Sequence, residues 1–270
     1  MILLLAGGGL LANLIAAAVA LRRGSVDAGG AAMGVLLGTA IFVSAGPLAW
    51  LVLGVFFVSS SVAGAVGAAR RPDLSALHQK GGRRDLVQAF ANVGPGAIMA
   101  ILLRATGEPA FAAGFAASLA AATADTWAGE IGVLSRRPPR SIVSLRPLER
   151  GLSGGVTFQG LAAALAGAVL IAAATVAVNA ATPLAGRRSL PLAAVVAAAG
   201  FAGSILDSLL GATVQALFRV PSTGALTERR EVDGERTVLV RGLPLVTNDV
   251  VNLVCTAVAG AAAAVAWSRL

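Results

Sequence analysis

The chain has 270 residues, of which 57% are hydrophobic and 13% are charged. A soluble domain usually carries about 25% charged residues, so no soluble fold of this length could bury so much apolar surface, and the solvent must be the lipid bilayer. One cysteine (Cys255) and one histidine (His78) exclude a disulfide framework and histidine-rich metal sites, and the basic runs, at a net charge of +8, lack the aromatic residues typical of nucleic-acid binding.

A transmembrane helix needs about 20 apolar residues. The sequence predicts an all-α, polytopic transmembrane bundle of about eight spans, formed by a single domain over residues 1–270. In chain order, the predicted spans are 2–21, 28–45, 47–69, 86–104, 109–134, 152–181, 190–218 and 245–268. The second span is short and rich in glycine, so the sequence leaves open whether it crosses the membrane fully.

Basic residues are concentrated in loops that alternation of the spans places on one side, namely 22–28, 70–85, 135–151 and 219–244. The positive-inside rule assigns this side to the cytoplasm, so we expect both termini outside and the chain in the inner membrane of the cell. The first span ends A18-V-A20, which resembles a signal-peptide cleavage site. Because Arg22-Arg23 follow the span and no basic residue precedes it, a retained helix is the favoured interpretation.

Several motifs recur in the two halves of the chain. Ser60 before Gly67-Ala68 resembles Ser204 before Gly211-Ala212, and Asn92 resembles Asn252. These pairs predict parallel four-span repeats, residues 1–104 and 109–270, related by an axis along the membrane normal. Ala- and Gly-rich helices also resemble one another by chance, since small residues let helices pack closely in lipid. Both interpretations stay open.

Acidic residues stand at the predicted cytoplasmic ends of three spans. The fifth span closes with A124-D-T-W-A-G-E-I-G132, the seventh carries Asp207, and Asp249 opens the eighth. A charged side chain at membrane depth costs about 2.5–3.5 kcal/mol on insertion scales, so such residues usually mark functional sites. Carboxylate oxygens are ligands that Mg²⁺ prefers. The predicted metal ligands are Asp125, Glu130, Asp207 and Asp249, of which the first three are also the predicted catalytic residues.

Two points limit this metal site. Asp125 and Glu130 are about 140° apart around a regular helix, so both can face one ion only if the helix breaks, for example at Gly129. Asp249 has the alternative interpretation of an N-terminal helix cap.

Polar and basic side chains near the same face predict phosphate binding. The S153-G-G155 segment opens the sixth span, where free backbone N–H groups and the helix dipole suit a phosphate, although a Gly-Gly pair is also common in packing or as a hinge. Polar residues of the fourth and eighth spans recur at four-residue spacing and so share a helix face. The residues predicted to bind phosphate or substrate are Arg84, Gln88, Asn92, Arg146, Ser153, Gly154, Gly155, Asn248 and Asn252.

Other sequence features narrow the chemistry. No G-x-x-x-x-G-K-[ST] motif occurs, which argues against a P-loop nucleotide site. The longest polar stretch, 219–244, contains T237-V-L-V240, which predicts a short strand or hairpin. His78 lies in a polar loop and is expected to be solvated.

Five segments, in order, resemble the motifs of the integral membrane family grouped as domain of unknown function 92. They are R83-R-D-L-V-Q-A-F-A-N92, A124-D-T-W-A-G-E-I-G132, S153-G-G-V156, G203-S-I-L-D-S-L-L-G-A212 and N248-D-V-V-N252. The family includes the animal transmembrane-protein-19 type and the plant phytyl-phosphate kinase, and the resemblance covers nearly the whole chain. The family usually has threonine where this chain has Leu152, and often a cysteine pair that is absent here.

This resemblance implies an isoprenoid-monophosphate kinase. Such an enzyme uses Mg²⁺ and a nucleoside triphosphate, CTP or another, to convert a prenyl or phytyl phosphate into the diphosphate at the cytoplasmic face. The expected partners are therefore this lipid phosphate and membrane lipid. The alternative is a transporter or flippase for a lipid phosphate or another anionic solute, because internal repeats and buried carboxylates suit that class too. A non-catalytic scaffold would leave the five motifs unexplained.

Overall fold

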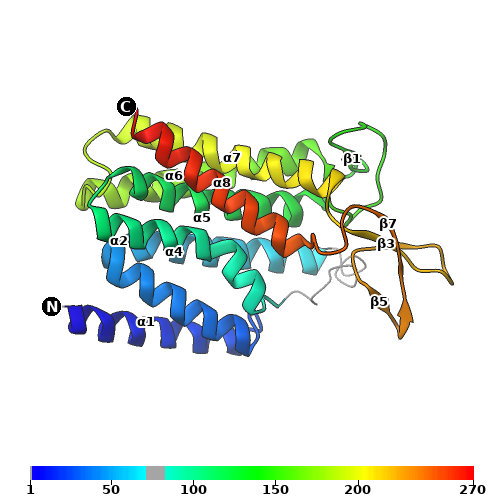
Figure 1. Ribbon diagram of the computed structural model, residues 1–270, viewed down its shortest axis with the longest axis horizontal. Coiled ribbons are helices and arrows are strands. Elements are labelled where there is room, and N and C mark those ends of the chain that lie inside the picture. Colours follow the sequence, from blue (N-terminus) through cyan, green and yellow to red (C-terminus); the bar gives the residue numbers. More distant parts are fainter. Residues whose placement is uncertain (1, 71–82) are drawn as a thin grey trace.

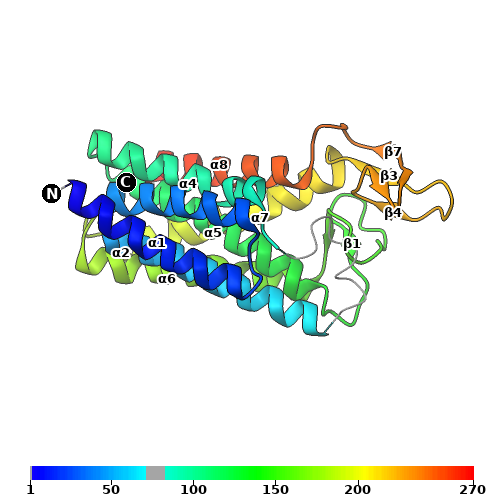
Figure 2. The same cartoon turned by 90° about the horizontal axis from the view of Figure 1, so that it is seen from below.

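The computed structural model describes residues 2–70 and 83–270 as a bundle of long helices with short strands at one end (Figures 1 and 2). The helices are α1 (Ile2–Arg22), α2 (Ala28–Arg70), α4 (Leu86–Thr106), α5 (Ala110–Gly132), α6 (Phe158–Ala181), α7 (Ser189–Thr213) and α8 (Asn248–Trp267). The predicted all-α polytopic membrane bundle is confirmed. His78 and most of the predicted loop 70–85 lie outside the described residues.

Helix α2 contains both the second and the third predicted span. A straight helix of 43 residues would be about 65 Å long, twice the hydrocarbon thickness of a bilayer. Gly46 instead adopts φ 89° and ψ 168° before Pro47 and breaks the helix. Both arms reach Arg84: a Cβ on Gly30 would lie 2.1 Å from its carbonyl oxygen, and the Arg84 guanidinium donates to Ser61 Oγ at 3.1 Å. The chain therefore reverses at Gly46, and each arm matches one predicted span.

Helix α5 is the centre of the bundle and contacts α2, α4, α6, α7 and α8. Every residue from Ala112 to Ala124 is buried. Six of the described helices are long and apolar enough to cross a membrane, and α5 is not among them. Because α5 is surrounded by protein, its small, less apolar residues do not have to face lipid, and they allow close packing. For example, a Cβ on Gly200 of α7 would lie only 2.5 Å from Ala120 Cβ.

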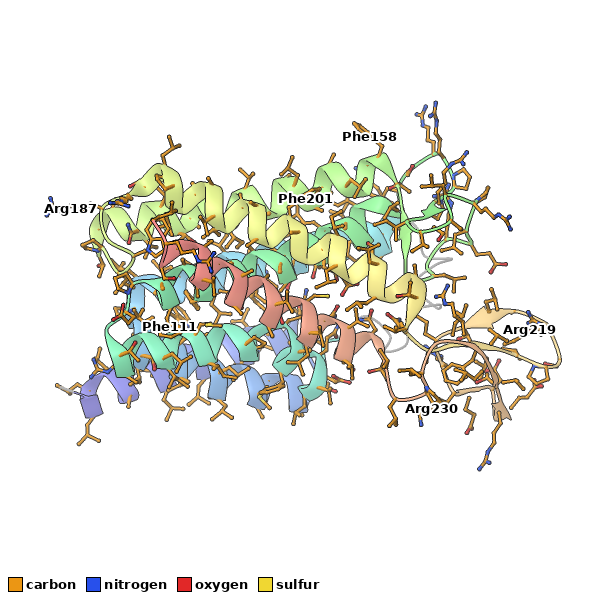
Figure 3. The ribbon with its side chains drawn as sticks, turned by 45° about the horizontal axis from the view of Figure 1, so that its top comes forward. Phe111, Phe158, Arg187, Phe201, Arg219 and Arg230 are labelled. Atoms are coloured by element: carbon orange, nitrogen blue, oxygen red, sulfur yellow. The ribbon has the colours of Figure 1, made fainter. Side chains whose placement is uncertain are left out.

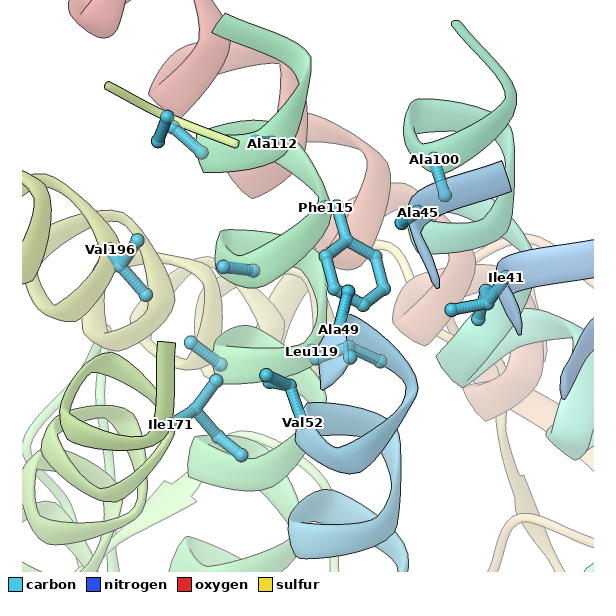
Figure 4. Close-up of a cluster of buried hydrophobic side chains, with 14 of the residues drawn as sticks. Ile41, Ala45, Ala49, Val52, Ala100, Ala112, Phe115, Leu119, Ile171 and Val196 are labelled. Carbon is cyan, nitrogen blue, oxygen red and sulfur yellow. The ribbon is translucent and has the colours of Figure 1, made fainter. Parts of the chain in front are cut away.

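The largest apolar cluster lies around the first half of α5 (Figure 4). Phe115 and Leu119 of α5 pack with side chains from both arms of α2, from α4, from α6 and from α7. The members labelled in Figure 4 are Ile41, Ala45, Ala49, Val52, Ala100, Ala112, Phe115, Leu119, Ile171 and Val196. This cluster fills the part of the bundle nearest the chain termini, which lie together at one end (Figures 1 and 2).

The opposite end, called here the strand-bearing end, carries all the described strands (Figure 1). These are β1 (Arg140–Ser141), β2 (Gly155–Val156), β3 (Leu217–Arg219), β4 (Leu226–Thr227), β5 (Glu231–Val232), β6 (Glu235–Arg236) and β7 (Val238–Arg241). Strands β4, β3 and β7 form an antiparallel sheet in that order, and β5 pairs with β6. The strand predicted around T237-V-L-V240 is therefore present. Residues 217–241 together are called the β-module.

Two predicted span boundaries are wrong. Helix α6 begins at Phe158 rather than at 152, because Thr157 caps it by accepting a hydrogen bond from the Gly160 N–H and the preceding Gly155 pairs with Ser141 in the β1–β2 ladder. Helix α7 ends at Thr213 rather than at 218. The chain turns after Thr213, and residues 217–218 belong to β3 instead. The other predicted spans agree with the helices to within a few residues.

Candidate functional site

A cavity of about 700 Å³ opens at the strand-bearing end of the bundle. Its walls come from α2, α4, α5, α6, α7 and α8 and from the connections at this end, including the segment that precedes α6. Of the predicted site residues, the cavity brings together Arg84, Gln88, Asn92, Asp125, Glu130, Ser153, Gly154, Gly155, Asp207, Asn248, Asp249 and Asn252. Arg146 does not line it.

Asp125 and Asp207 form the acidic centre of the cavity. Asp125 lies in the last turns of α5 and Asp207 in the second half of α7, and their carboxyl groups are close enough to interact directly. Asp207 is 8% exposed, and its Oδ2 is buried without a hydrogen-bond partner among the described residues. Two carboxylates this close repel each other unless they share a proton or bind a cation. The pair is therefore a place where a cation would be favoured.

Glu130 faces a different neighbour from Asp125. Helix α5 continues without a break through Gly129 to Gly132, so the two acids diverge as the helical geometry requires. The Glu130 carboxylate lies against the second arm of α2, where a Cβ on Gly67 would come within 2.6 Å of its Oε2. It also interacts electrostatically with Arg84. Glu130 thus partners an arginine rather than completing the Asp125–Asp207 pair.

Arg84 is held just before the start of α4, where Asp85 caps the helix by accepting from the Gln88 N–H. Its guanidinium donates to Ser61 Oγ and lies 5.7 Å from the centre of the Phe57 ring. Burial lowers the pKa of Arg84 and the nearby Glu130 carboxylate raises it, and a guanidinium keeps its charge under both influences. The cavity therefore contains a fixed positive charge on the wall formed by α2 and α4.

Amides and hydroxyls complete the cavity wall. Asn92 of α4 and Asn252 of α8 are each 6% exposed, and Ser60 of α2 is fully buried. Asn252 Oδ1 and Ser60 Oγ have no hydrogen-bond partner among the described residues. Leaving a buried polar atom unpaired costs about 1–3 kcal/mol. Such atoms at a cavity are expected where a ligand supplies the missing partner.

These donor atoms fit Mg²⁺ in part. Mg²⁺ is usually bound through one or two carboxylates, with water and substrate phosphates as the other ligands. The Asp125–Asp207 pair and the buried Asn252 Oδ1 are suitable oxygen ligands. The four predicted carboxylate ligands do not form one group, however, since no cluster of three or more acidic, cysteine or histidine side chains occurs within residues 2–70 and 83–270.

The S153-G-G155 segment is not a helix start, contrary to our expectation. Gly154 has φ 85° and lies so close to α7 that a Cβ would be 2.5 Å from the Ala212 backbone, so glycine is required here for packing. The Ser153 N–H donates to Glu228 Oε1 at 3.1 Å, and Ser153 Oγ accepts from Gln215 Nε2 at 2.9 Å. The Glu228 carboxylate of the β-module therefore binds the Ser153 N–H, one of the groups that we predicted to bind phosphate.

Comparison with known proteins places this chain in a family. The family model described as Integral membrane protein DUF92 matches residues 11–260. The chain belongs to this family. Protein PGR of Arabidopsis thaliana is 31% identical over 257 residues, 86% of each chain. An uncharacterized membrane protein of Methanocaldococcus jannaschii is 37% identical over 99 residues, which are 37% of this chain and 38% of its own. No solved structure matches the chain significantly.

The DUF92 match contains every residue of the cavity, but the predicted role of Arg146 and the alternative interpretation of Asp249 as a helix cap differ from the geometry. Arg146 is exposed in the loop before α6, and Arg150 lines the cavity instead. The Arg150 guanidinium donates to the carbonyls of Val133, Ser135 and Arg136 just after α5. Asp249 is not the cap of α8, because Thr247 Oγ1 accepts from the Val250 N–H.

The structure adds residues to the DUF92 site that sequence reasoning missed. Glu228 reaches the cavity from the β-module, and Ser61 and Ser208 line it from α2 and α7. Ser60, which the sequence singles out only through the possible repeat, and Ser204, which is also part of a family motif, both lie on the cavity wall. The available signals for the serines were the run S59-S-S61 inside an apolar helix and the position of Ser208 directly after Asp207. Glu228 gave no signal, because it lies in a polar loop among other charges.

Proposed function

We propose that this protein is an integral membrane kinase that phosphorylates an isoprenoid monophosphate at the cytoplasmic face. The observation that carries the proposal is the convergence of the Asp125–Asp207 pair, the Arg84 cation and the unpaired amide oxygen of Asn252 in one cavity at the strand-bearing end. Positioning and charge neutralisation are the main requirements of phosphoryl transfer, and these groups supply both.

In the proposed reaction, an oxygen of the lipid monophosphate attacks the terminal phosphorus of a nucleoside triphosphate. One P–O bond forms to the lipid phosphate, and the P–O bond to the leaving nucleoside diphosphate breaks. With a dianionic lipid phosphate as acceptor, no proton has to be removed. The carboxylates are therefore more useful as cation ligands than as bases.

Mg²⁺ bound at Asp125 and Asp207 would neutralise charge on the transferring phosphates. Arg84 would hold the acceptor phosphate from the opposite wall, because a guanidinium binds phosphate through parallel N–H groups. Asn92 and Asn252 would orient its oxygens. The isoprenoid chain would lie between helices, whose outer surfaces are already matched to lipid.

The packing of the other half of the bundle supports an enzyme over the alternative of a lipid-phosphate transporter or flippase. A transported anion needs polar groups along the whole path. Beyond the cavity, α5 instead packs through Phe115 and Leu119 into the apolar cluster with Ile171. The described cavity therefore has an access route from the strand-bearing end and a packed apolar region beyond it.

The test is a phosphoryl-transfer assay with the purified protein in lipid nanodiscs. Nucleoside triphosphate labelled at the γ-phosphate is supplied with geranylgeranyl or phytyl phosphate, with Mg²⁺ or with chelator. We expect labelled lipid diphosphate only with Mg²⁺, and its loss in Asp125→Asn. The matched control is Glu108→Gln, which neutralises an exposed acid at the opposite end of the bundle. Absence of product from every nucleotide, or full activity in Asp125→Asn, would overturn the proposal.

A further inference from the structure

A second cavity, of about 390 Å³, lies beside the first and belongs to the β-module and its connections. Its volume is within the range of about 300–1,000 Å³ that is typical of small-molecule sites. Its walls are Gln215 and Phe218 on one side, the Glu228–Glu231 segment on another, and Pro244, Thr247 and Asn248 before and within the first turn of α8. None of its walls except Asn248 comes from a helix, so a ligand there would enter from water.

Two residues connect this small cavity to the large one. Glu228 and Asn248 line both. Glu228 also accepts from the Ser153 N–H and interacts electrostatically with Asp207 and with Arg241 of β7. A ligand that extends from the small cavity into the large one must therefore pass the Glu228 carboxylate.

In the wall of the small cavity, Gln215 has a buried hydrogen-bond acceptor without a partner among the described residues. It is 1% exposed, its Nε2 donates to Ser153 Oγ, and its Oε1 has no hydrogen-bond partner among the described residues. A buried acceptor of this kind favours a ligand that carries hydrogen-bond donors such as amino or hydroxyl groups. Arg230 adds a cation to the rim, where its guanidinium donates to the Pro244 carbonyl at 2.6 Å.

We infer that the small cavity binds the nucleoside part of the phosphoryl donor, with its phosphates extending past Arg230 into the large cavity. This inference rests on the proposed function, and it assigns the donor and the lipid acceptor to separate cavities. A nucleoside triphosphate is water-soluble, which matches a cavity outside the helices. Its hydroxyl and amino groups can donate hydrogen bonds to Gln215 Oε1, and its negative charge matches the arginine at the rim. Its phosphates replace the Glu228 carboxylate at the Ser153 N–H, so Glu228 holds the phosphate position until the donor arrives.

The experiment measures binding of labelled ATP, CTP, GTP and UTP to the full-length protein in nanodiscs without lipid phosphate. We expect Arg230→Gln to weaken binding of the preferred nucleotide about 5- to 10-fold, because a charged hydrogen-bond donor is removed. Glu228→Gln is expected to tighten it about 3- to 10-fold, because a like charge is removed from beside the phosphates. The preferred nucleoside without phosphates should compete.

Arg219→Gln is the matched control, since Arg219 is an exposed arginine of the same module that lines neither cavity (Figure 3). In the transfer assay, Arg230→Gln should raise KM for the nucleotide and leave KM for the lipid phosphate unchanged. Unchanged nucleotide binding in both Arg230→Gln and Glu228→Gln, in a protein that still phosphorylates lipid, overturns the assignment of this cavity alone. Absence of nucleotide binding and of transfer in the wild type overturns the proposed function as well.

Discussion

Buried amide side chains are bonded differently in the two halves of the bundle. In the half near the termini, Asn13 donates to the Gly9 carbonyl and accepts from Trp50 Nε1, and Asn179 donates to the Gly186 carbonyl and accepts from the Ala185 N–H. In the strand-bearing half, Asp207 Oδ2 and Asn252 Oδ1 have no partner among the described residues. Buried amides on the two sides of the same membrane protein are thus satisfied in one half and left open in the other.

This difference separates residues that hold the fold from residues held for a ligand. A fully paired buried amide stabilises the native state, whereas an unpaired buried oxygen destabilises it. Natural sequences tolerate such a local conflict mainly at functional sites. The comparison predicts that substitutions in the cavity half lower activity more than stability, and that substitutions in the other half do the reverse.

The largest expected effect is at Asp207. In Asp207→Asn, the repulsion with Asp125 is removed, so thermal stability in detergent should be unchanged or higher. If the proposed cation site is correct, activity should fall on the order of 100-fold or more, because one of its two carboxylate ligands is lost. The measurement pairs kcat with the unfolding temperature of the same preparation. A variant that loses both in proportion would place Asp207 among the structural residues and break the comparison.

At Gly154, we expect one substitution to lower both the stability of the fold and the activity of the cavity. Gly154→Ala puts a Cβ at φ 85° and against Ala212, so we expect a loss of about 2–4 kcal/mol in the free energy of unfolding. The displacement of Ser153 from α7 should also lower activity. Gly224→Ala is the control, because Gly224 has a similar φ of 74° but open space around it. Equal stability losses in the two variants would show that backbone strain alone, and not packing against α7, explains the effect.

Much of this arrangement could be predicted from the sequence because polar residues are rare at membrane depth. Asp125, Asp207 and Asn252 stand out against their apolar neighbours, and the alternation of spans places them at one end. The parallel repeat stays a prediction. The sequence could not show which arginine of the 135–151 loop faces the cavity, since that depends on irregular backbone such as Leu145 at φ 57°. Nor could it place Glu228, because polar loops carry no periodic signal.

The two amides Asn179 and Asn252 give a direct test of the comparison. Asn179→Ala removes two side-chain hydrogen bonds to the α6–α7 turn, and the free energy of unfolding should fall by about 1–3 kcal/mol while the specific activity of the folded protein is kept. Asn252→Ala removes an amide oxygen that has no partner among the described residues, so stability should change less and activity more. Urea or SDS titration, read beside kcat, gives both quantities. If both variants lose stability equally, the open oxygen of Asn252 has a structural role instead.

The smallest expected effect is at Arg150, which lines the cavity but bonds only backbone in the structure. Its guanidinium bridges three carbonyls after the end of α5, and lysine offers a single charged centre in place of this fork. Arg150→Lys should therefore cost about 1 kcal/mol of stability, with KM for the lipid phosphate unchanged. Arg84→Lys is the matched variant, because the hydrogen-bond partner of the Arg84 guanidinium among the described residues is the Ser61 hydroxyl rather than a carbonyl, and there we expect the lipid KM to rise. If KM for the lipid phosphate rises equally in Arg150→Lys, an arginine's effect on the substrate depends on its proximity to the cavity and not on its hydrogen-bond partners.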